Sequence, residues 1–171
     1  LDNLRAAADW CLANDQPQLL ARLVNRMYGF WWASEYMNEG MKLMREVLRH
    51  GERVPLDERL ACMAGLASSV ATTFDISAAV ELATQAIEFS DGRASAVLAT
   101  AMVGRAMNRA FQMSAQGADQ ELVAEVRREA AAAYDMVCSA QPSQLRMQVE
   151  MCRAWMESAL GDLSAAVRWW R

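Results

Sequence analysis

The sequence predicts an all-α protein built as an α-solenoid, that is, a stack of antiparallel helix pairs. Alanine is frequent and methionine occurs 12 times, whereas only 3 prolines and 8 glycines are present. Isoleucine occurs only at Ile76 and Ile87, so good helix formers far outnumber β-branched residues. Apolar residues recur at helical spacing and show no strand-like alternation. An internal repeat is the third observation, and it predicts the solenoid.

Two segments of the chain share one short pattern. Residues 75–80 read DISAAV and residues 162–167 read DLSAAV, and residues 34–43 fit the same template more loosely. Each segment lies where a short corner leads into an apolar helical pattern. This recurrence predicts a structural unit that the chain uses several times.

A small residue occupies the same place in each of these segments. Gly40, Ala79 and Ala166 are 39 and then 87 residues apart, close to one and two periods of about forty residues. We expect a small residue here because adjacent helices cross closely at this point. A two-helix repeat of this length is typical of an α-solenoid.

Turn and capping signals divide the chain into helices in order. Pro17 can open a helix because its missing N–H costs nothing in the first turn. The stretch from Gly51 to Pro55 ends a helix, and Asp57 and Glu58 suit the positive end of the next one. The expected helices cover residues 1–14, 17–33, 35–50, 56–73, 76–90, 93–115, 119–140, 143–160 and 163–171.

The short connections between these helices predict antiparallel neighbours. We therefore expect one helical-repeat domain over residues 1–171. It consists of a leading helix and four helix pairs, at residues 1–14, 17–50, 56–90, 93–140 and 143–171. The first residue is not Met and a helical pattern runs into the last residue, so we expect a piece excised from a longer chain.

Composition excludes several classes of function. The net charge of -4 argues against direct nucleic-acid binding, which needs a basic face. No apolar run reaches the length of about eighteen residues that a membrane span needs, and no signal peptide is present, so we expect a cytoplasmic protein. The four cysteines are expected to be buried free thiols; they are Cys11, Cys62, Cys138 and Cys152.

Catalytic, metal and cofactor sites are not expected. His50 is the only histidine and stands at the end of a helix, where it can cap carbonyl groups. One histidine and scattered cysteines do not supply metal-ligand spacing, and no glycine-rich phosphate loop occurs. Among the paired acids, Glu125 and Glu129 flank Arg127 and Arg128, which indicates a solvated helix face.

Five aromatic residues gather between positions 28 and 36. Adjacent helical residues diverge by about 100°, so at least one of these rings must lie outside the core. We expect Tyr28, Trp31 and Tyr36 to be core residues. Trp32 is the candidate for contact with a ligand or another domain.

Two apolar features are open to a structural and a binding interpretation. The helix over residues 119–140 carries an apolar stripe, which predicts either core packing or a groove for a partner helix. The methionines between residues 102 and 156 predict either core filling or an adaptable binding surface. They are Met102, Met107, Met113, Met147, Met151 and Met156.

The corner and small-residue pattern resembles degenerate tetratricopeptide repeats. The resemblance implies a right-handed solenoid whose concave face binds partners. Tyr28 departs from the family pattern, which has a small residue there, and Glu150 and Arg153 fall on positions that the family keeps apolar. Carried over from the family, the concave-face binding candidates are Arg22, Asn25, Trp32, Ser68, Gln148 and Trp155.

The first helix carries a more specific resemblance. Residues 2–12, DNLRAAADWCL, look like the helix that follows the ATPase and winged-helix regions of large bacterial transcriptional regulators with a LuxR-like or adenylate-cyclase domain. The resemblance implies a repeat region that senses an inducer or partner and governs the ATPase switch. The implied partners are the ATPase and DNA-binding domains of its own chain and a protein, peptide or small-molecule effector.

We therefore expect a noncatalytic sensor and protein-interaction module. The alternative is a pure peptide- or protein-binding scaffold without switching, and a small helical enzyme is the weakest hypothesis. Self-association is also expected, because an array that is cut between repeats leaves apolar ends at Leu1 and at Trp169-Trp170.

Overall fold

The computed structural model describes residues 1–69, 75–92, 95–117, 119–138 and 143–170. Within these ranges the chain is helical and contains no strand, which confirms the all-α prediction. The helices are α1 (Asp2–Ala13), α2 (Pro17–Arg26), α3 (Tyr28–Ala33), α4 (Met37–Arg49), the 3-10 turn η1 (Gly51–Arg53), α5 (Leu56–Ser69), α6 (Ile76–Phe89), α7 (Ala96–Gln116), α8 (Gln120–Cys138), α9 (Ser143–Ala159) and α10 (Leu163–Trp169).

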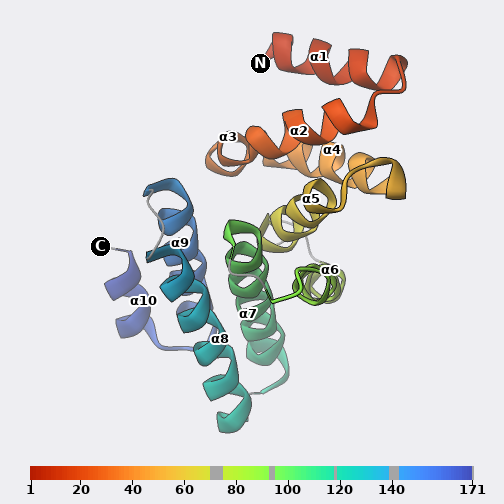
Figure 1. The fold of residues 1–171 in the computed structure, drawn as a ribbon. Coiled ribbons are helices and arrows are strands. Elements are labelled where there is room, and N and C mark those ends of the chain that lie inside the picture. Colours follow the sequence, from red (N-terminus) through yellow and green to blue (C-terminus); the bar gives the residue numbers. More distant parts are fainter. Residues whose placement is uncertain (70–74, 93–94, 118, 139–142, 171) are drawn as a thin grey trace.

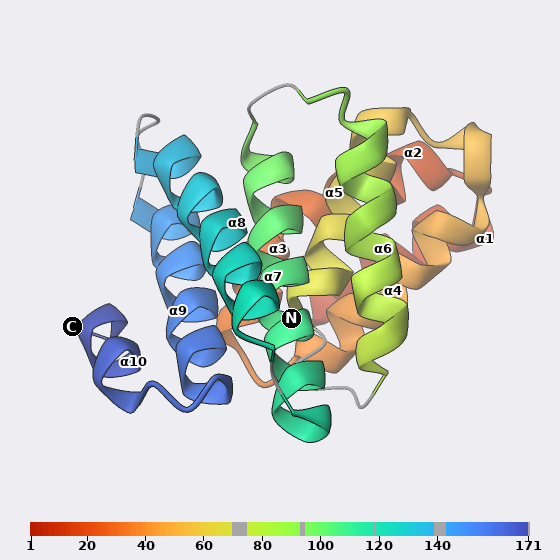
Figure 2. The ribbon, with the colours of Figure 1, turned by 90° about the horizontal axis from the view of Figure 1, so that it is seen from below.

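The helices follow one another across the molecule from α1 at one side to α10 at the other (Figures 1 and 2). Neighbours along the chain pack together, as α5 does with α6, α7 with α8, and α9 with α10. A second set of contacts joins α2 to α5, α5 to α7, and α7 to α9. The first helices of the four expected pairs therefore form one continuous row.

The segments that share a sequence pattern also share a local structure. Asp75 precedes α6 and accepts a hydrogen bond from the backbone N–H of Ala78 at 3.1 Å. Asp162 precedes α10 and accepts the equivalent bond from Ala165 at 2.9 Å. Both aspartates are N-caps, which satisfy a backbone donor that the first helical turn leaves unpaired.

The small residues of the repeat are buried, as expected for close helix crossings. Ala79 and Ala166 lie in the interior, and Gly40 lies against the indole of Trp31. The close crossing that the sequence predicted is therefore present at Gly40.

The expected helix over residues 17–33 is broken at Met27. The chain changes direction there, and α3 is turned away from the axis of α2 (Figure 1). The turn buries Trp31, whose indole N–H donates to the carbonyl oxygen of Val24 at 3.3 Å. The burial of this large side chain thus overrides the continuous helical pattern of the sequence. Helix propensity contributes less free energy per residue than the burial of a large apolar side chain does.

Other helix ends differ by a few residues from their expected positions. The helix expected from residue 35 begins at Met37. The helix expected from residue 93 begins at Ala96, because the Ser95 hydroxyl caps it by accepting from the N–H of Leu98 at 3.1 Å. The expected helical residues 70–73, 93–94, 139–140 and 171 lie outside the described residues.

Two main apolar clusters form the core. One joins α7, α8 and α9, and the other joins α1 to α5. The apolar stripe of α8 belongs to the first cluster, so its structural interpretation is confirmed. Its fully buried members are Val126, Ala130, Ala133 and Val137.

Two expectations about polar groups are wrong. Cys138 is exposed, although the other three cysteines are buried. The Glu129 side chain is only 8% exposed and lies between Arg105 and Arg109, so it does not belong to a solvated face. Burial raises the pKa of Glu129 even though both arginines act in the opposite direction.

None of the described helices combines the length and the apolar character that crossing a bilayer demands.

Candidate binding site

One apolar cavity lies where α3, α4, α5, α7 and α9 meet. We call it the Trp32–Trp155 cavity; its volume is about 410 Å³. It is lined by Trp32, Ala33, Met37, Ser68, Ser69, Met107, Met147, Met151, Cys152 and Trp155. This volume is within the range of about 300–1,000 Å³ that is typical of small-molecule sites.

Three of the residues proposed from the sequence meet in this cavity. Trp32 comes from α3, Ser68 from α5 and Trp155 from α9. Residues that are far apart in the chain thus line one cavity.

Sequence reasoning did not assign Cys152 to this site, and it named Met107, Met147 and Met151 only among methionines that could fill the core or form a binding surface; all four line the cavity. Met147, Met151 and Trp155 follow one another at intervals of four residues, and four residues also separate Gln148 from Cys152. Residues at this spacing share one face of a helix. The signal was therefore present in the sequence once one residue of α9 had been assigned to the cavity.

A chain of hydrogen bonds closes one edge of the cavity. The Gln148 Nε2 donates to the phenol oxygen of Tyr28 at 2.7 Å, and that oxygen lies 2.5 Å from the Ser68 Oγ. The Ser68 hydroxyl donates to the carbonyl oxygen of Ala64 at 3.0 Å, so the Tyr28 hydroxyl donates to Ser68. We call these three side chains the Tyr28 bridge; it links α3, α5 and α9 across 120 residues.

Burial raises the pKa of the Tyr28 phenol, and this effect exceeds the opposing effect of its hydrogen bonds. The phenol therefore remains protonated and can donate within the bridge. The ring lies against Gly65, where a β-carbon would stand 3.0 Å from the ring edge.

A second, smaller cavity adjoins the bridge. We call it the Asn25 cavity; its volume is about 200 Å³. Tyr28 and Gln148 line it, whereas Ser68 lines the larger cavity, so the Tyr28 bridge stands at the boundary between the two. The remaining lining residues are Asn25, Ala61, Ala64, Gly65, Ala96, Val97, Thr100 and Leu145.

Asn25 is held by internal hydrogen bonds. Its Nδ2 donates to the carbonyl oxygen of Glu58 at 3.0 Å and to the Glu58 carboxylate at 2.6 Å. Its Oδ1 accepts from the Cys62 thiol at 3.2 Å. Asn25 therefore joins α2 to α5, and its amide is already engaged.

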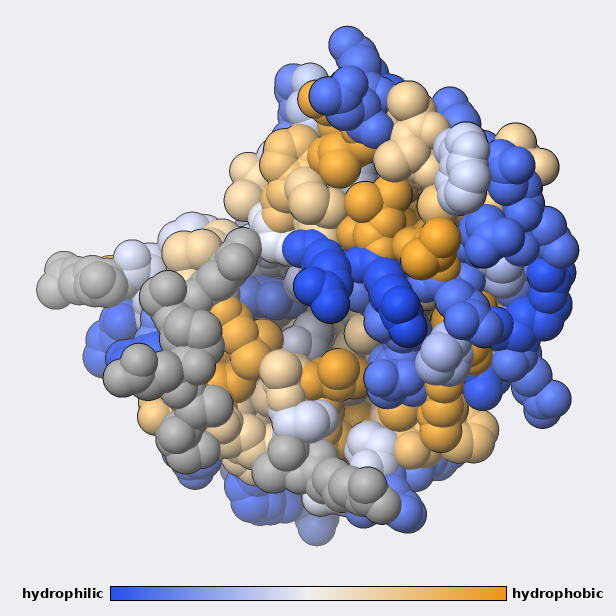
Figure 3. Space-filling model, turned by 45° about the horizontal axis from the view of Figure 1, so that its top comes forward, coloured by the Kyte–Doolittle hydropathy of each residue, from blue (hydrophilic) through white to orange (hydrophobic). Residues whose placement is uncertain are grey.

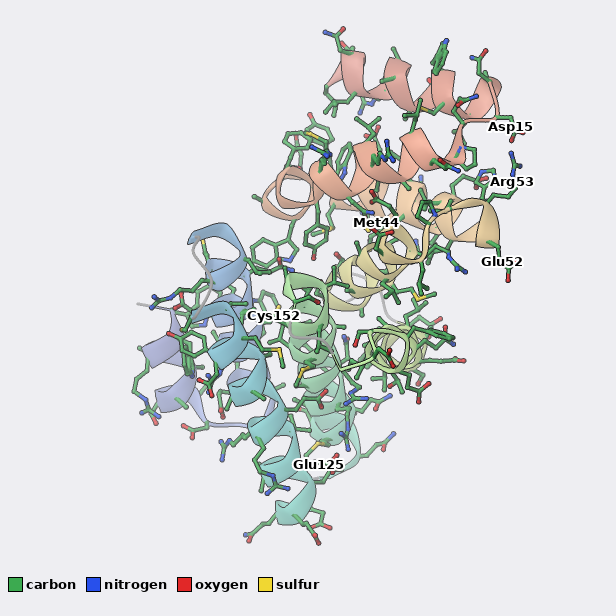
Figure 4. The ribbon with its side chains drawn as sticks, in the orientation of Figure 1. Asp15, Met44, Glu52, Arg53, Glu125 and Cys152 are labelled. Carbon is green, nitrogen blue, oxygen red and sulfur yellow. The ribbon has the colours of Figure 1, made fainter. Side chains whose placement is uncertain are left out.

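Arg22 lies apart from the other candidates. It lines an exposed polar hollow of about 520 Å³ beside Asp15 and Arg53. Arg53 donates to the Asp15 carboxylate at 2.6 Å, and both side chains lie together at the edge of the molecule (Figure 4). The structure therefore brings five of the six sequence-predicted residues to two adjoining cavities and leaves Arg22 outside.

The cavity offers little acid–base chemistry. Burial raises the pKa of Cys152, on the face of α9 toward α7, to about 12, so the thiol stays neutral and is a poor nucleophile (Figure 4). Among the described residues, no cluster of His, Cys, Asp or Glu side chains could hold a metal ion. Apolar residues form orange patches among hydrophilic residues on one face of the molecule (Figure 3).

No family model, curated protein or solved structure matches the chain. We therefore infer its function from the candidate site and from the resemblances that its sequence carries.

Proposed function

We propose that the chain is a noncatalytic effector-binding module. The observation that carries this proposal is the convergence of Trp32, Ser68 and Trp155, from three different helices, on one apolar cavity of about 410 Å³. A concave apolar site with a few convergent polar groups is the usual form of a ligand site.

The repeat architecture supports the same proposal. The continuous row of α2, α5, α7 and α9 and the equivalent aspartate caps favour a right-handed solenoid of degenerate tetratricopeptide-like repeats. In such a solenoid both cavities would lie on the concave face. This is the face on which repeat proteins bind their partners.

A catalytic role finds less support in the cavity. Its ionisable lining group is the neutral Cys152 thiol, and the Ser68 hydroxyl is held in the Tyr28 bridge. A nucleophile needs an adjacent base to activate it, and the described residues that line the cavity provide none.

We further propose that the module belongs to a cytoplasmic bacterial transcriptional regulator and couples effector binding to an ATPase switch. This part rests on the resemblance of residues 2–12 to the corresponding helix of such proteins. In the structure α1 is held to the first repeat by Arg5, which pairs with both carboxylate oxygens of Glu39 at 2.9 Å. An effector would shift the switch only by binding one of its two states more tightly.

Tryptophan fluorescence tests the binding role. The chain would be titrated with metabolite fractions and, separately, with peptide fractions of a cell extract. We expect a saturable change with a metabolite fraction that is lost in Trp32→Phe or Trp155→Phe. Trp10→Phe is the control, because Trp10 is exposed on α1 and lines neither cavity.

Two other results would argue against this function. A response to peptide fractions alone would favour the scaffold that binds without switching. A response to no fraction, with the fold intact by circular dichroism, would contradict an effector-binding role.

A further inference from the structure

Among the residues that the structure describes, none that lines the Trp32–Trp155 cavity is charged. Its walls are tryptophan, methionine and alanine side chains, two serine hydroxyls and a thiol. Two charged residues of the helices that line the cavity pair elsewhere: Arg105 of α7 with Glu129 at 2.7 Å, and Glu157 of α9 with Arg127 at 2.6 Å. A charged ligand would therefore lose its hydration without gaining a counter-ion, which is costly.

The polar edge of the cavity is already satisfied by the protein itself. A serine hydroxyl has one proton to donate and two lone pairs to accept. Ser68 donates to Ala64, accepts from Tyr28 and lies 3.3 Å from the Gln148 amide, which also donates to it. A ligand therefore meets little unused hydrogen-bonding capacity at this edge, and apolar contact must supply most of its affinity.

The amide N–H groups that line the Asn25 cavity are also occupied. The Asn25 Nδ2 donates to Glu58, and the Gln148 Nε2 belongs to the Tyr28 bridge. The Nδ2 of buried Asn108 donates to the carbonyl oxygens of Ala67 and Gly104, each at 2.7 Å, whereas its Oδ1 has no hydrogen-bond partner; Asn108 lines neither cavity. An extended peptide needs partners for its own backbone groups, and the amide N–H groups of Asn25 and Gln148 are not free to provide them.

The remaining walls suit a ring system. Tryptophan faces favour flat apolar groups, and thioether side chains adapt to irregular shapes and interact well with aromatic rings. Met147 and Met151 stand one helical turn apart on α9, next to Trp155. Met147 is 47% exposed, and its unbranched side chain has three rotatable bonds that let it adapt to a ligand.

We propose that the ligand of the Trp32–Trp155 cavity is a neutral, predominantly apolar small molecule with a ring system. The inference rests on the proposed effector-binding function and specifies the chemistry of its effector. Charged metabolites and peptides are the competing classes of ligand.

Two fluorescent probes that share one ring system test the proposal. N-phenyl-1-naphthylamine is neutral, and 8-anilino-1-naphthalenesulfonate carries one added sulfonate. We expect the neutral probe to bind at least about tenfold more tightly, since tenfold corresponds to about 1.4 kcal/mol and burial of an unpaired charge costs more than that.

Matched variants assign this binding to the cavity. Met147→Glu replaces an apolar wall group by a carboxylate, which loses hydration when a ligand covers it, and should weaken binding of the neutral probe. Met147→Leu keeps an apolar wall and should weaken binding less than Met147→Glu does. Phe89→Glu changes an exposed apolar residue that lines neither cavity and should also have no effect.

The possible outcomes separate the two levels of inference. Equal affinities for both probes, lost together in Trp155→Ala, would overturn the neutral-ligand class and leave the cavity as a binding site. Displacement of the neutral probe by capped peptides, but not by neutral ring compounds, would likewise overturn it. If folded parent protein binds neither probe, the effector-binding function itself fails.

Discussion

Trp31 occupies the space that a side chain at residue 40 would need. A β-carbon on Gly40 would stand 2.5 Å from the Cγ and 2.7 Å from the Cβ of Trp31. Trp31 is 1% exposed and lies in the core that joins α1 to α5, so it has no room to withdraw. The small residue of the first repeat is therefore a packing requirement between α3 and α4.

Gly40→Ala should destabilise the fold for this reason. Overpacking a core costs about 1–3 kcal/mol, whereas alanine gains at most about 1 kcal/mol over glycine in a helix. The clash involves the Cβ and Cγ of Trp31, which have no room to move. We therefore expect the free energy of unfolding, measured by urea denaturation, to fall.

Asn38→Ala in the same helix is the control, since Asn38 is exposed and its replacement should be neutral or slightly stabilising. A Gly40→Ala protein as stable as the parent would contradict the close crossing of α3 and α4.

Tyr28→Phe should weaken the contact between α3 and α9. The change removes the hydroxyl group that accepts a hydrogen bond from Gln148 and donates one to Ser68. A buried donor left without its partner costs about 1–3 kcal/mol, so the free energy of unfolding should fall by that order. Hydrogen exchange should also become faster in α9.

Tyr36→Phe is the matched control, because Tyr36 lies outside the bridge. It should change stability less than Tyr28→Phe does. Equal effects of the two substitutions would show that the bridge contributes no stability of its own.

The four cysteines should react at very different rates in the native protein. Cys138 is exposed, whereas Cys11, Cys62 and Cys152 are buried. Burial raises the pKa of both Cys62 and Cys152 to about 12, which suppresses the reactive thiolate. With iodoacetamide at pH 8, peptide mapping should find Cys138 modified first; early modification of Cys152 would contradict its burial.

The same shifts predict a loss of stability at alkaline pH. The unfolded chain releases the Cys152 proton near pH 8.5, whereas the folded chain holds it until about pH 12. The folded state binds the extra proton between these values, so its stability is complete below the lower pKa and falls as pH rises toward the higher one. Cys152→Ala should show a shallower decline in urea melts between pH 8 and 11; an identical slope would refute this coupling.

Arg153→Gln should loosen α10. The guanidinium carbon of Arg153 lies 3.7 Å from the ring centroid of Trp169 and 5.3 Å from that of Tyr134, so it ties α9 to α10 and α8. A cation–π contact is worth about 0.5–2 kcal/mol, and α10 is short. Hydrogen exchange in α10 should become faster while α2 is unchanged.

Arg146→Gln provides the comparison, since the Arg146 guanidinium carbon lies 5.7 Å from the ring centroid of Tyr134 in α8. Equal exchange in α10 of the Arg153→Gln variant and the parent would show that Arg153 does not hold that helix.

Much of the fold could be predicted because it depends on local patterns. Helical spacing, turn residues and the repeated DISAAV and DLSAAV segments located the helices, and the structure then showed Asp75 and Asp162 to be equivalent caps. The break at Met27 could not be predicted in this way, because it depends on how Trp31 packs against a residue of another helix. The same limit applies to Glu129, whose burial between two arginines of α7 is invisible along α8.

The candidate site, too, could be predicted only in part from the sequence. Trp32, Ser68 and Trp155 could be proposed from a repeat register, since a register states which side of each helix a residue occupies. Only the tertiary structure decided that Tyr28 reaches Gln148, that the Tyr28 bridge separates two cavities, and that Arg22 lies elsewhere. The sequence by itself determined the helices and their apolar faces, because these follow from neighbours along the chain. The cavities arise from the way successive helix pairs stack, and that geometry depends on contacts between residues up to 120 positions apart.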